Sequence, residues 1–190
     1  MAYPKSESAL LLIDWQRGFD DHARWGGTRN NPAAEDNAAR LLRAWRDRGR
    51  PVFHVRHLSK DKNSPLSESN PGSAMKSALA PMPGEPLTTK HVNSAFIGTN
   101  LDQTLREAGI GALTICGLTT DHCVSTTVRM AANLGYDVVL AEDAAATFDR
   151  KSPDGDLIPA ATVHAVHLAS LHAEFCSVRT TSAILDRASH

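Results

Sequence analysis

The run Ala9-Leu10-Leu11-Leu12-Ile13 is followed at once by an acidic residue, Asp14. Five apolar residues in succession show no alternation between an apolar and a polar face. The run therefore predicts a strand covered on both sides, as the central strands of parallel sheets are. In such sheets ligands bind outside the carboxyl ends of the strands. This stretch thus predicts a fold class and places a carboxylate where ligands bind.

Further apolar runs alternate with segments of helical periodicity, which is typical of sheets built from strand–helix–strand units. Strands are expected at 9–13, 52–55, 112–116, 137–141 and 175–178, and a further short strand is expected to end near 89–90. Helices are expected at 37–48, 99–107, 121–134, 158–171 and 181–187. We predict an α/β fold, a three-layer α/β/α sandwich with a six-stranded parallel sheet in the Rossmann-like order 3-2-1-4-5-6. At about 150 residues per domain, residues 1–190 are expected to form one domain.

The composition favours a small-molecule or protein partner. Lys and Arg number 20 and Asp and Glu number 21, so the formal net charge is −1 and gives no electrostatic footprint for nucleic acid or an anionic membrane. No apolar run approaches the roughly 18 residues that span a bilayer, and the first residues do not resemble a signal peptide. A cytoplasmic location is expected.

The stretch 59–86 is rich in Ser, Pro, Gly and Asn and has little periodicity. A loop this long inside a compact domain is usually functional, and we interpret it either as a lid or as a contact between subunits. The odd number of cysteines, Cys116, Cys123 and Cys176, predicts free thiols in a reducing compartment. Cys116 and Cys176 lie within apolar strands and are interpreted as packing residues.

Three chemical groups follow strand ends: the carboxylate of Asp14, the ammonium of Lys90 and the thiol of Cys123. In the predicted strand order, Lys90 must reach across the second strand, and its long stem allows this. A thiol in the first turn of a helix and near an ammonium is expected to favour the thiolate. Asp14 could take the thiol proton and later deliver it to a leaving amine.

These residues resemble the isochorismatase-like cysteine hydrolases, the superfamily of nicotinamidases and N-carbamoylsarcosine amidases. The resemblance covers nearly the whole chain. The segments that carry it are Leu12-Ile13-Asp14-Trp15-Gln16-Arg17-Gly18-Phe19, Lys90-His91-Val92-Asn93-Ser94-Ala95-Phe96, Cys116-Gly117-Leu118-Thr119-Thr120-Asp121-His122-Cys123-Val124 and Val138 to Ala144. The resemblance implies an Asp14, Lys90 and Cys123 catalytic triad. It also implies a cis peptide between Leu118 and Thr119, an oxyanion hole from the N–H groups of Thr119 and Cys123, and a homo-oligomer, either a dimer or a tetramer.

Nicotinamidases of this superfamily hold a metal with an Asp-x-His segment after the second strand, and this chain has His54-Val55-Arg56-His57-Leu58-Ser59 there. No Asp stands two positions before either histidine, and in a strand His54 and His57 point to opposite faces. We therefore expect neither a metal nor another cofactor. The residues expected to contact substrate follow strand ends and are Phe19, Trp25, His57, Phe96 and Thr120.

The sequence thus favours a metal-independent, cysteine-dependent hydrolase of a C–N bond in a small amide, urea or carbamoyl compound. Two alternatives remain. One is the acid-catalysed cleavage of a vinyl ether by the Asp14–Lys90 pair, as in isochorismatases that lack the cysteine. The other is a non-catalytic module that binds a small molecule.

Overall fold

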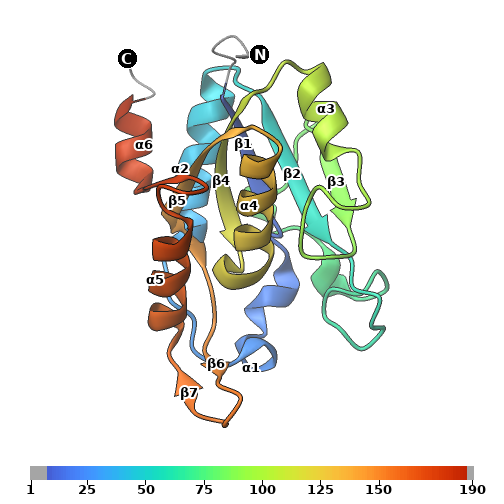
Figure 1. Cartoon of the computed structure of the whole chain (residues 1–190). Helices are drawn as coiled ribbons and strands as arrows, with labels where there is room; N and C mark the ends of the chain where they lie inside the picture. Colours follow the sequence, from blue (N-terminus) through green and yellow to red (C-terminus); the bar gives the residue numbers. More distant parts are fainter. Residues whose placement is uncertain (1–7, 188–190) are drawn as a thin grey trace.

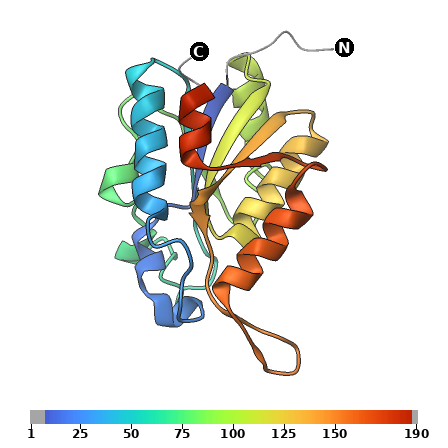
Figure 2. The same ribbon diagram turned by 90° about the vertical axis from the view of Figure 1, so that its left-hand side faces the viewer.

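A parallel sheet between two layers of helices is the frame of the molecule (Figures 1 and 2). The computed structural model describes residues 8–187. The sheet contains β1 (Ser8–Ile13), β2 (Val52–His57), β3 (Leu87–Lys90), β4 (Ala112–Leu118), β5 (Asp137–Ala146) and β8 (Ser177–Arg179). Its order is β3-β2-β1-β4-β5-β8 and all neighbouring strands pair in parallel, which confirms the predicted sandwich and strand order.

The helices divide between the two faces of the sheet (Figure 2). One layer holds α2 (Ala34–Asp47) and α6 (Thr181–Arg187), and the other holds α3 (Leu101–Glu107), α4 (Ser125–Asn133) and α5 (Ala160–Leu171). Along β1, Leu10 and Leu12 pack into the core beneath α2, whereas Leu11 and Ile13 pack into the core beneath α4. Because apolar residues serve both faces, β1 is apolar throughout.

Several boundaries differ from those predicted. Residues 150–158 form a protruding antiparallel hairpin of β6 (Arg150–Lys151) and β7 (Leu157–Ile158), so α5 starts at Ala160 (Figure 1). The short helices η1 (Arg17–Asp20), α1 (His22–Trp25), η2 (Pro71–Ser73) and η3 (Ser77–Leu79) were not predicted, because each is shorter than the window in which periodicity can be detected. The expected helix at 121–134 consists of a π-helical turn, η4 (Thr120–Val124), followed by α4.

The long loop between β2 and β3 is attached to the end of β1. Gln16 and Met75 form an antiparallel bridge, and the Lys76 N–H donates to the Trp15 carbonyl at 2.8 Å. The side-chain amide of Gln16 also donates to the Ser73 carbonyl at 2.9 Å. These bonds fix the middle of the loop against the carboxyl edge of the sheet.

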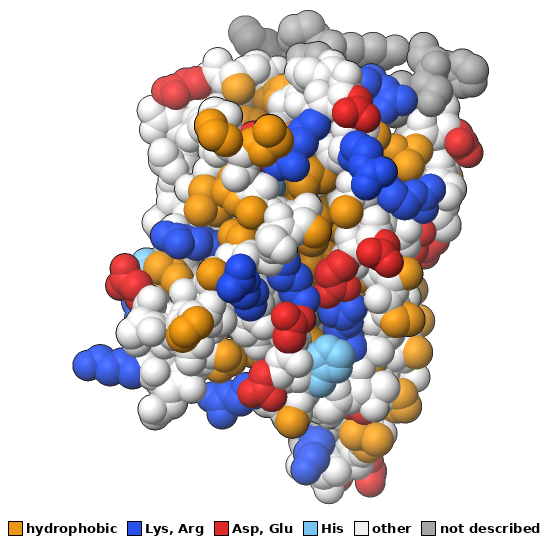
Figure 3. Space-filling model, turned by 180° about the vertical axis from the view of Figure 1, so that it is seen from behind, with side chains coloured by type: hydrophobic (Ala, Val, Ile, Leu, Met, Phe, Trp, Pro, Cys, Tyr) orange, Lys and Arg blue, Asp and Glu red, His pale blue; other side chains and the backbone are white. Residues whose placement is uncertain are grey.

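Basic and acidic side chains are interspersed on the face seen from behind (Figure 3). Within residues 8–187, no helix is both long enough and apolar enough to cross a bilayer.

Candidate active site

The carboxylate of Asp14 lies directly beyond the end of β1. Its φ angle of 54° turns the chain away from the sheet, in a left-handed conformation that Asp tolerates better than most residues. The side chain is fully buried. Its Oδ2 accepts a hydrogen bond from Lys90 at 2.7 Å, whereas Oδ1 has no hydrogen-bond partner among the described residues. One carboxylate oxygen therefore remains available as a proton acceptor.

The ammonium of Lys90 lies at the centre of the site. Lys90 ends β3, and its stem crosses β2 to reach the end of β1, as the predicted strand order requires. Its Nζ is 2.7 Å from Asp14 Oδ2, 3.1 Å from Cys123 Sγ and 3.1 Å from His57 Nδ1. His57 and Lys90 are register partners on neighbouring strands, so their side chains emerge on the same face of the sheet. The three acceptors surround one fully buried ammonium.

The turn after β4 carries the thiol of Cys123. At Gly117 the φ angle is 150°, and a Cβ atom there would lie 2.2 Å from the carbonyl oxygen of Ile13, so only glycine allows β4 to approach β1 this closely. The Leu118–Thr119 peptide bond is cis. The turn η4 follows and holds Cys123, which is 8% exposed.

Burial sets the charge states in this cluster. It raises the pKa of the Cys123 thiol well above its ordinary value, and the negative charge of Asp14 raises it further, against the opposing effect of Lys90. The net pKa of the Cys123 thiol is therefore raised, which runs against the expected preference for the thiolate. For Lys90, burial lowers the pKa, but Asp14 and Cys123 outweigh it, so the net pKa is raised and the ammonium persists.

Hydrogen bonds to Asp121 hold the η4 turn against residues that follow β5. Asp121 accepts hydrogen bonds from Arg150 at 2.7 and 3.1 Å and from the Thr147 hydroxyl at 2.5 Å. Burial would raise the pKa of Asp121, but the hydrogen bonds from Arg150 and Thr147 outweigh it and lower the pKa to about 2. The carboxylate stays charged and links the turn to the base of the β6–β7 hairpin.

A cavity of about 110 Å³ opens onto Asp14 and Cys123. Phe19, Trp25 and His57, which the sequence nominated as substrate contacts, line it. The rings of Phe19 and Trp25 lie 4.6 Å apart, and the Trp25 indole N–H donates to the Gly18 carbonyl at 2.8 Å. These two rings form an apolar wall beside the reactive groups.

Two residues nominated as substrate contacts lie elsewhere. Phe96 stacks on Tyr136, with ring centroids 5.9 Å apart, and packs against the core on the α3–α4 face. Thr120 is fully buried, and its hydroxyl is 2.8 Å from His164 Nδ1 on α5. Both residues follow strand ends, but neither is among the residues that line the cavity at Asp14 and Cys123.

Other cavity residues were not predicted as contacts, namely Leu66, Asn93 and His122. Thr119, expected only as an N–H donor, also lines the cavity, and its buried Oγ1 has no partner among the described residues. Leu66 comes from the long loop, where the sequence offered no signal. Asn93 and His122 lie in the quoted motifs, so their nearness to Lys90 and Cys123 was the available signal.

Comparison with known proteins identifies the family. The isochorismatase domain model matches residues 8–182. The chain belongs to the isochorismatase family. The isochorismatase family protein YrdC of Bacillus subtilis is 42% identical over 182 residues, which are 96% of each chain. A crystal structure of an isochorismatase-family protein from Chromobacterium violaceum superposes with a TM-score of 0.93 at 44% identity, covering 100% of this chain and 97% of that one.

A further family relative is named for its reaction. Ureidoacrylate amidohydrolase RutB of Rhizobium rhizogenes is 32% identical over 138 residues, which are 72% of this chain and 51% of that protein. The isochorismatase family thus includes hydrolases that act on C–N bonds.

The metal site of nicotinamidases within this family does not fit the residues present here. The histidine at the end of β2 is His57, and its Nδ1 already accepts a hydrogen bond from Lys90. Ligand atoms of Asp14, His57 and Cys123 do lie within 4.8 Å of one another. Lys90 Nζ, however, contacts all three side chains, so the ammonium takes the place that a cation would need.

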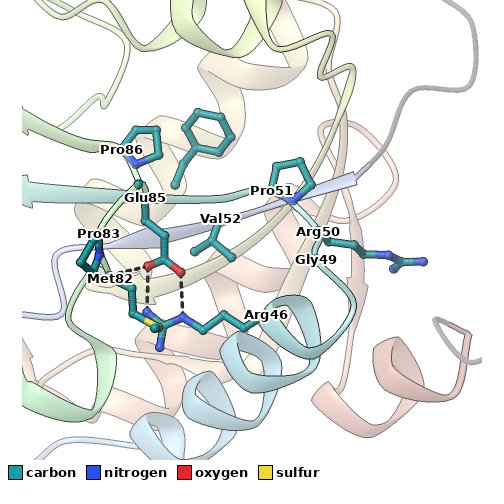
Figure 4. Close-up of a pocket in the computed structure, with 11 residues that line it drawn as sticks. Arg46, Gly49, Arg50, Pro51, Val52, Met82, Pro83, Glu85 and Pro86 are labelled. Atoms are coloured by element: carbon teal, nitrogen blue, oxygen red, sulfur yellow. Dashed lines mark hydrogen bonds and ion pairs between the residues drawn. The ribbon is translucent and has the colours of Figure 1, made fainter.

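A larger cavity of about 480 Å³ lies at the opposite end of β2 and contains none of the motif residues of the isochorismatase family (Figure 4). Two of its charged side chains, Arg46 and Glu85, form an ion pair. Glu85 accepts from Arg46 at 2.7 and 2.8 Å, and His54 Nε2 lies 2.8 Å from the same carboxylate. His54 therefore belongs to this distant ion pair and not to the site that contains His57.

Proposed function

We propose that this chain is a cysteine-dependent hydrolase of a C–N bond in a small amide, urea or carbamoyl compound. The observation that carries the proposal is the buried ammonium of Lys90, held between the carboxylate of Asp14 and the thiol of Cys123. The arrangement joins a nucleophile, a base and a fixed positive charge at the mouth of one cavity.

In the first half of the reaction, Cys123 forms a thioester. Asp14 Oδ1, which has no other partner in the described chain, takes the thiol proton as Sγ attacks the substrate carbonyl carbon. The C–N bond then breaks, and Asp14 delivers the proton to the departing nitrogen. Ammonia or a small amine leaves.

In the second half, water attacks the thioester carbonyl. Asp14 takes a proton from this water, the C–S bond breaks, and the proton passes to Sγ. The products are an acid and the regenerated thiol. No step in this cycle requires a metal or an organic cofactor.

The developing oxyanion is assigned to the N–H groups of Thr119 and Cys123. Lys90 contributes through its charge. Its hydrogen bonds are directed to Asp14, His57 and Cys123, so it does not have to bind the substrate oxygen directly.

The cavity favours a small neutral substrate. Asp14 and Lys90 neutralise each other, and Phe19 and Trp25 offer flat apolar surface. A free carboxylate or phosphate would lose its hydration without gaining a second cation among the residues that line the cavity. The proposal also includes a cytoplasmic location and a homo-oligomer, a dimer or tetramer, whose size light scattering would measure.

Cleavage of a vinyl ether is the alternative reaction. It would use Asp14 and Lys90 but not a nucleophile, whereas Cys123 lies 3.1 Å from Lys90 Nζ and is positioned to take part. A non-catalytic binding module would bind the same small amides without turnover.

The test is a screen of small primary amides, ureas and carbamoyl compounds for released ammonia or amine, repeated with Cys123→Ala. We expect at least one substrate and a loss of at least about a thousandfold in kcat for the variant, because a nucleophile is removed. Cys176→Ala, which alters a buried thiol directly before β8, is the matched control. Binding without turnover would support the binding module, and isochorismate cleavage that survives Cys123→Ala would support the ether alternative.

A further inference from the structure

The protons of the Lys90 ammonium can be counted. An ammonium has three N–H donors and no acceptor. Lys90 Nζ has three acceptors at hydrogen-bond distance, namely Asp14 Oδ2, Cys123 Sγ and His57 Nδ1. The side chain is fully buried, so water does not supply another partner. Each donor is therefore matched to one acceptor, and His57 is the acceptor that the catalytic triad does not include.

The count also fixes the state of His57. A ring nitrogen that accepts from an ammonium carries no proton, so the proton of the neutral ring is on Nε2. Burial lowers the pKa of His57, and the charge of Lys90 lowers it further, against smaller opposing effects of Asp14 and the Val92 backbone. The neutral ring is thus the resting form.

The position of His57 is fixed by a second buried side chain. Gln16 Oε1 accepts from the His57 N–H at 2.8 Å, and Gln16 Nε2 donates to the His57 carbonyl at 2.8 Å. Gln16 is fully buried and lies two residues after Asp14. Two acceptors of the Lys90 ammonium are therefore held by the same short segment, because Asp14 lies in residues 14–16 and His57 is bonded to Gln16.

We infer that His57 is a positioning residue for Lys90, whose Nδ1 accepts the third ammonium N–H and thereby directs the other two at Asp14 and Cys123. The part of this inference that concerns turnover rests on the proposed function. The part that concerns the reactivity of the Cys123 thiol does not. Without this acceptor, the ammonium would turn its donors away from Sγ. The Lys90 hydrogen bond and charge lower the pKa of Cys123, so their loss would reduce the thiolate fraction.

Three substitutions separate this role from simple packing. His57→Asn places an amide oxygen close to the position of Nδ1. His57→Gln places its amide near Nε2 and leaves the Nδ1 position without an acceptor. His57→Leu fills the space with no acceptor at all. His91→Asn is the matched control, because the His91 ring, at the same strand end, bonds to the Leu58 carbonyl and not to Lys90.

The readout is the alkylation rate of Cys123 by iodoacetamide at fixed pH, followed by peptide mapping, which requires no substrate. We expect roughly tenfold slower alkylation for the Gln and Leu variants, from the loss of one charged hydrogen bond, and near-normal rates for His57→Asn and His91→Asn. In a Lys90→Met background, His57→Leu should change the rate little further, because its effect passes through Lys90.

Equal rates for the Asn, Gln and Leu variants, or an undiminished effect of His57→Leu without Lys90, would overturn the inference. Thermal unfolding of each variant identifies any that do not fold. If Lys90→Met does not fold, the comparison of His57→Asn with His57→Gln still tests whether His57 positions Lys90. With an amide substrate, the Gln variant should lose kcat at unchanged KM, whereas a substrate contact would raise KM. If no variant or parent turns over an amide but the alkylation pattern holds, only the proposed function fails.

Discussion

At Cys123, opposing effects on one thiol can be compared. The start of a helix stabilises a nearby negative charge by about 0.3–1 kcal/mol, whereas burial of an ionisable group shifts its pKa by up to about 3–5 units. Burial is thus the larger effect, and the adjacent carboxylate of Asp14 acts in the same direction. Lys90 opposes both but does not outweigh them. The net pKa of the thiol is raised, and the proposed mechanism therefore has a base remove its proton in the reaction itself.

The raised pKa of the Cys123 thiol predicts that kcat/KM depends little on pH near neutrality. If the reactive form is the neutral thiol with Asp14 as its base, kcat/KM should change by less than about threefold from pH 6 to 8. The raised pKa of Lys90 keeps the ammonium intact across that range. The measurement is a pH profile of an amide found in the screen. A tenfold rise per pH unit would instead show that a preformed thiolate is required.

Among the elements, the η4 turn depends most on a single anchor. Asp121 is nearly buried, and its carboxylate joins the turn before Cys123 to Arg150 at the start of the β6–β7 hairpin. The hairpin protrudes from the sheet (Figure 1), and the residue that connects it to the η4 turn, Arg150, lies at its base.

Asp121→Asn should lower the free energy of unfolding by about 2 kcal/mol near neutral pH, because it weakens charged hydrogen bonds in a buried setting. The pKa of Asp121 is lowered from 3.8 to about 2, so its stabilisation is present above pH 3.8 and is lost as the pH falls through about 2. Urea unfolding of parent and variant should therefore converge between those values. The matched control, Asp154→Asn at the exposed hairpin tip, should change stability little; a constant difference down to pH 2 would contradict the assignment.

The elements also show how far the sequence could be interpreted. The alternation of apolar runs with helical segments predicted the parallel sheet. The positions of Asp14, Lys90 and Cys123 after strand ends predicted the cluster, because the carboxyl ends of parallel strands lie along one edge of the sheet. That Phe96 and Thr120 do not line the cavity could not be predicted, since nearness to a strand end does not determine where a side chain points. The raised pKa of Cys123 could not be predicted, because its burial depends on segments distant in sequence, including the loop that carries Leu66.

At the scale of the whole molecule, the residues that line the cavity come from several segments that meet at one edge of the sheet. The loop between β2 and β3 was expected to be a lid or a subunit contact. The Gln16–Met75 bridge attaches the middle of this loop to the segment that follows β1. Opening it would break the hydrogen bonds of Gln16, which also hold His57.

The same convergence predicts how the whole protein responds to metals. Activity should survive exhaustive treatment with EDTA, because Lys90 supplies the positive charge between Asp14, His57 and Cys123. Added zinc should inhibit, since it prefers these same nitrogen, sulfur and oxygen ligands and must displace the ammonium to reach them. Ammonia release before and after dialysis measures both effects. Activity lost with EDTA and restored by zinc would contradict the metal-independent mechanism.

The buried pair of Asp14 and Lys90 has a consequence for the electrostatics of turnover. Before the proton moves, the site holds one negative charge, one positive charge and a neutral thiol. Afterwards it holds a neutral acid, the same positive charge and a thiolate. The site is electroneutral in both states, so the barrier does not include the creation of net charge in a medium of low dielectric constant. Mobile ions in the surrounding solution have no net charge to screen, and ionic strength should leave the chemical step on a neutral amide unaffected.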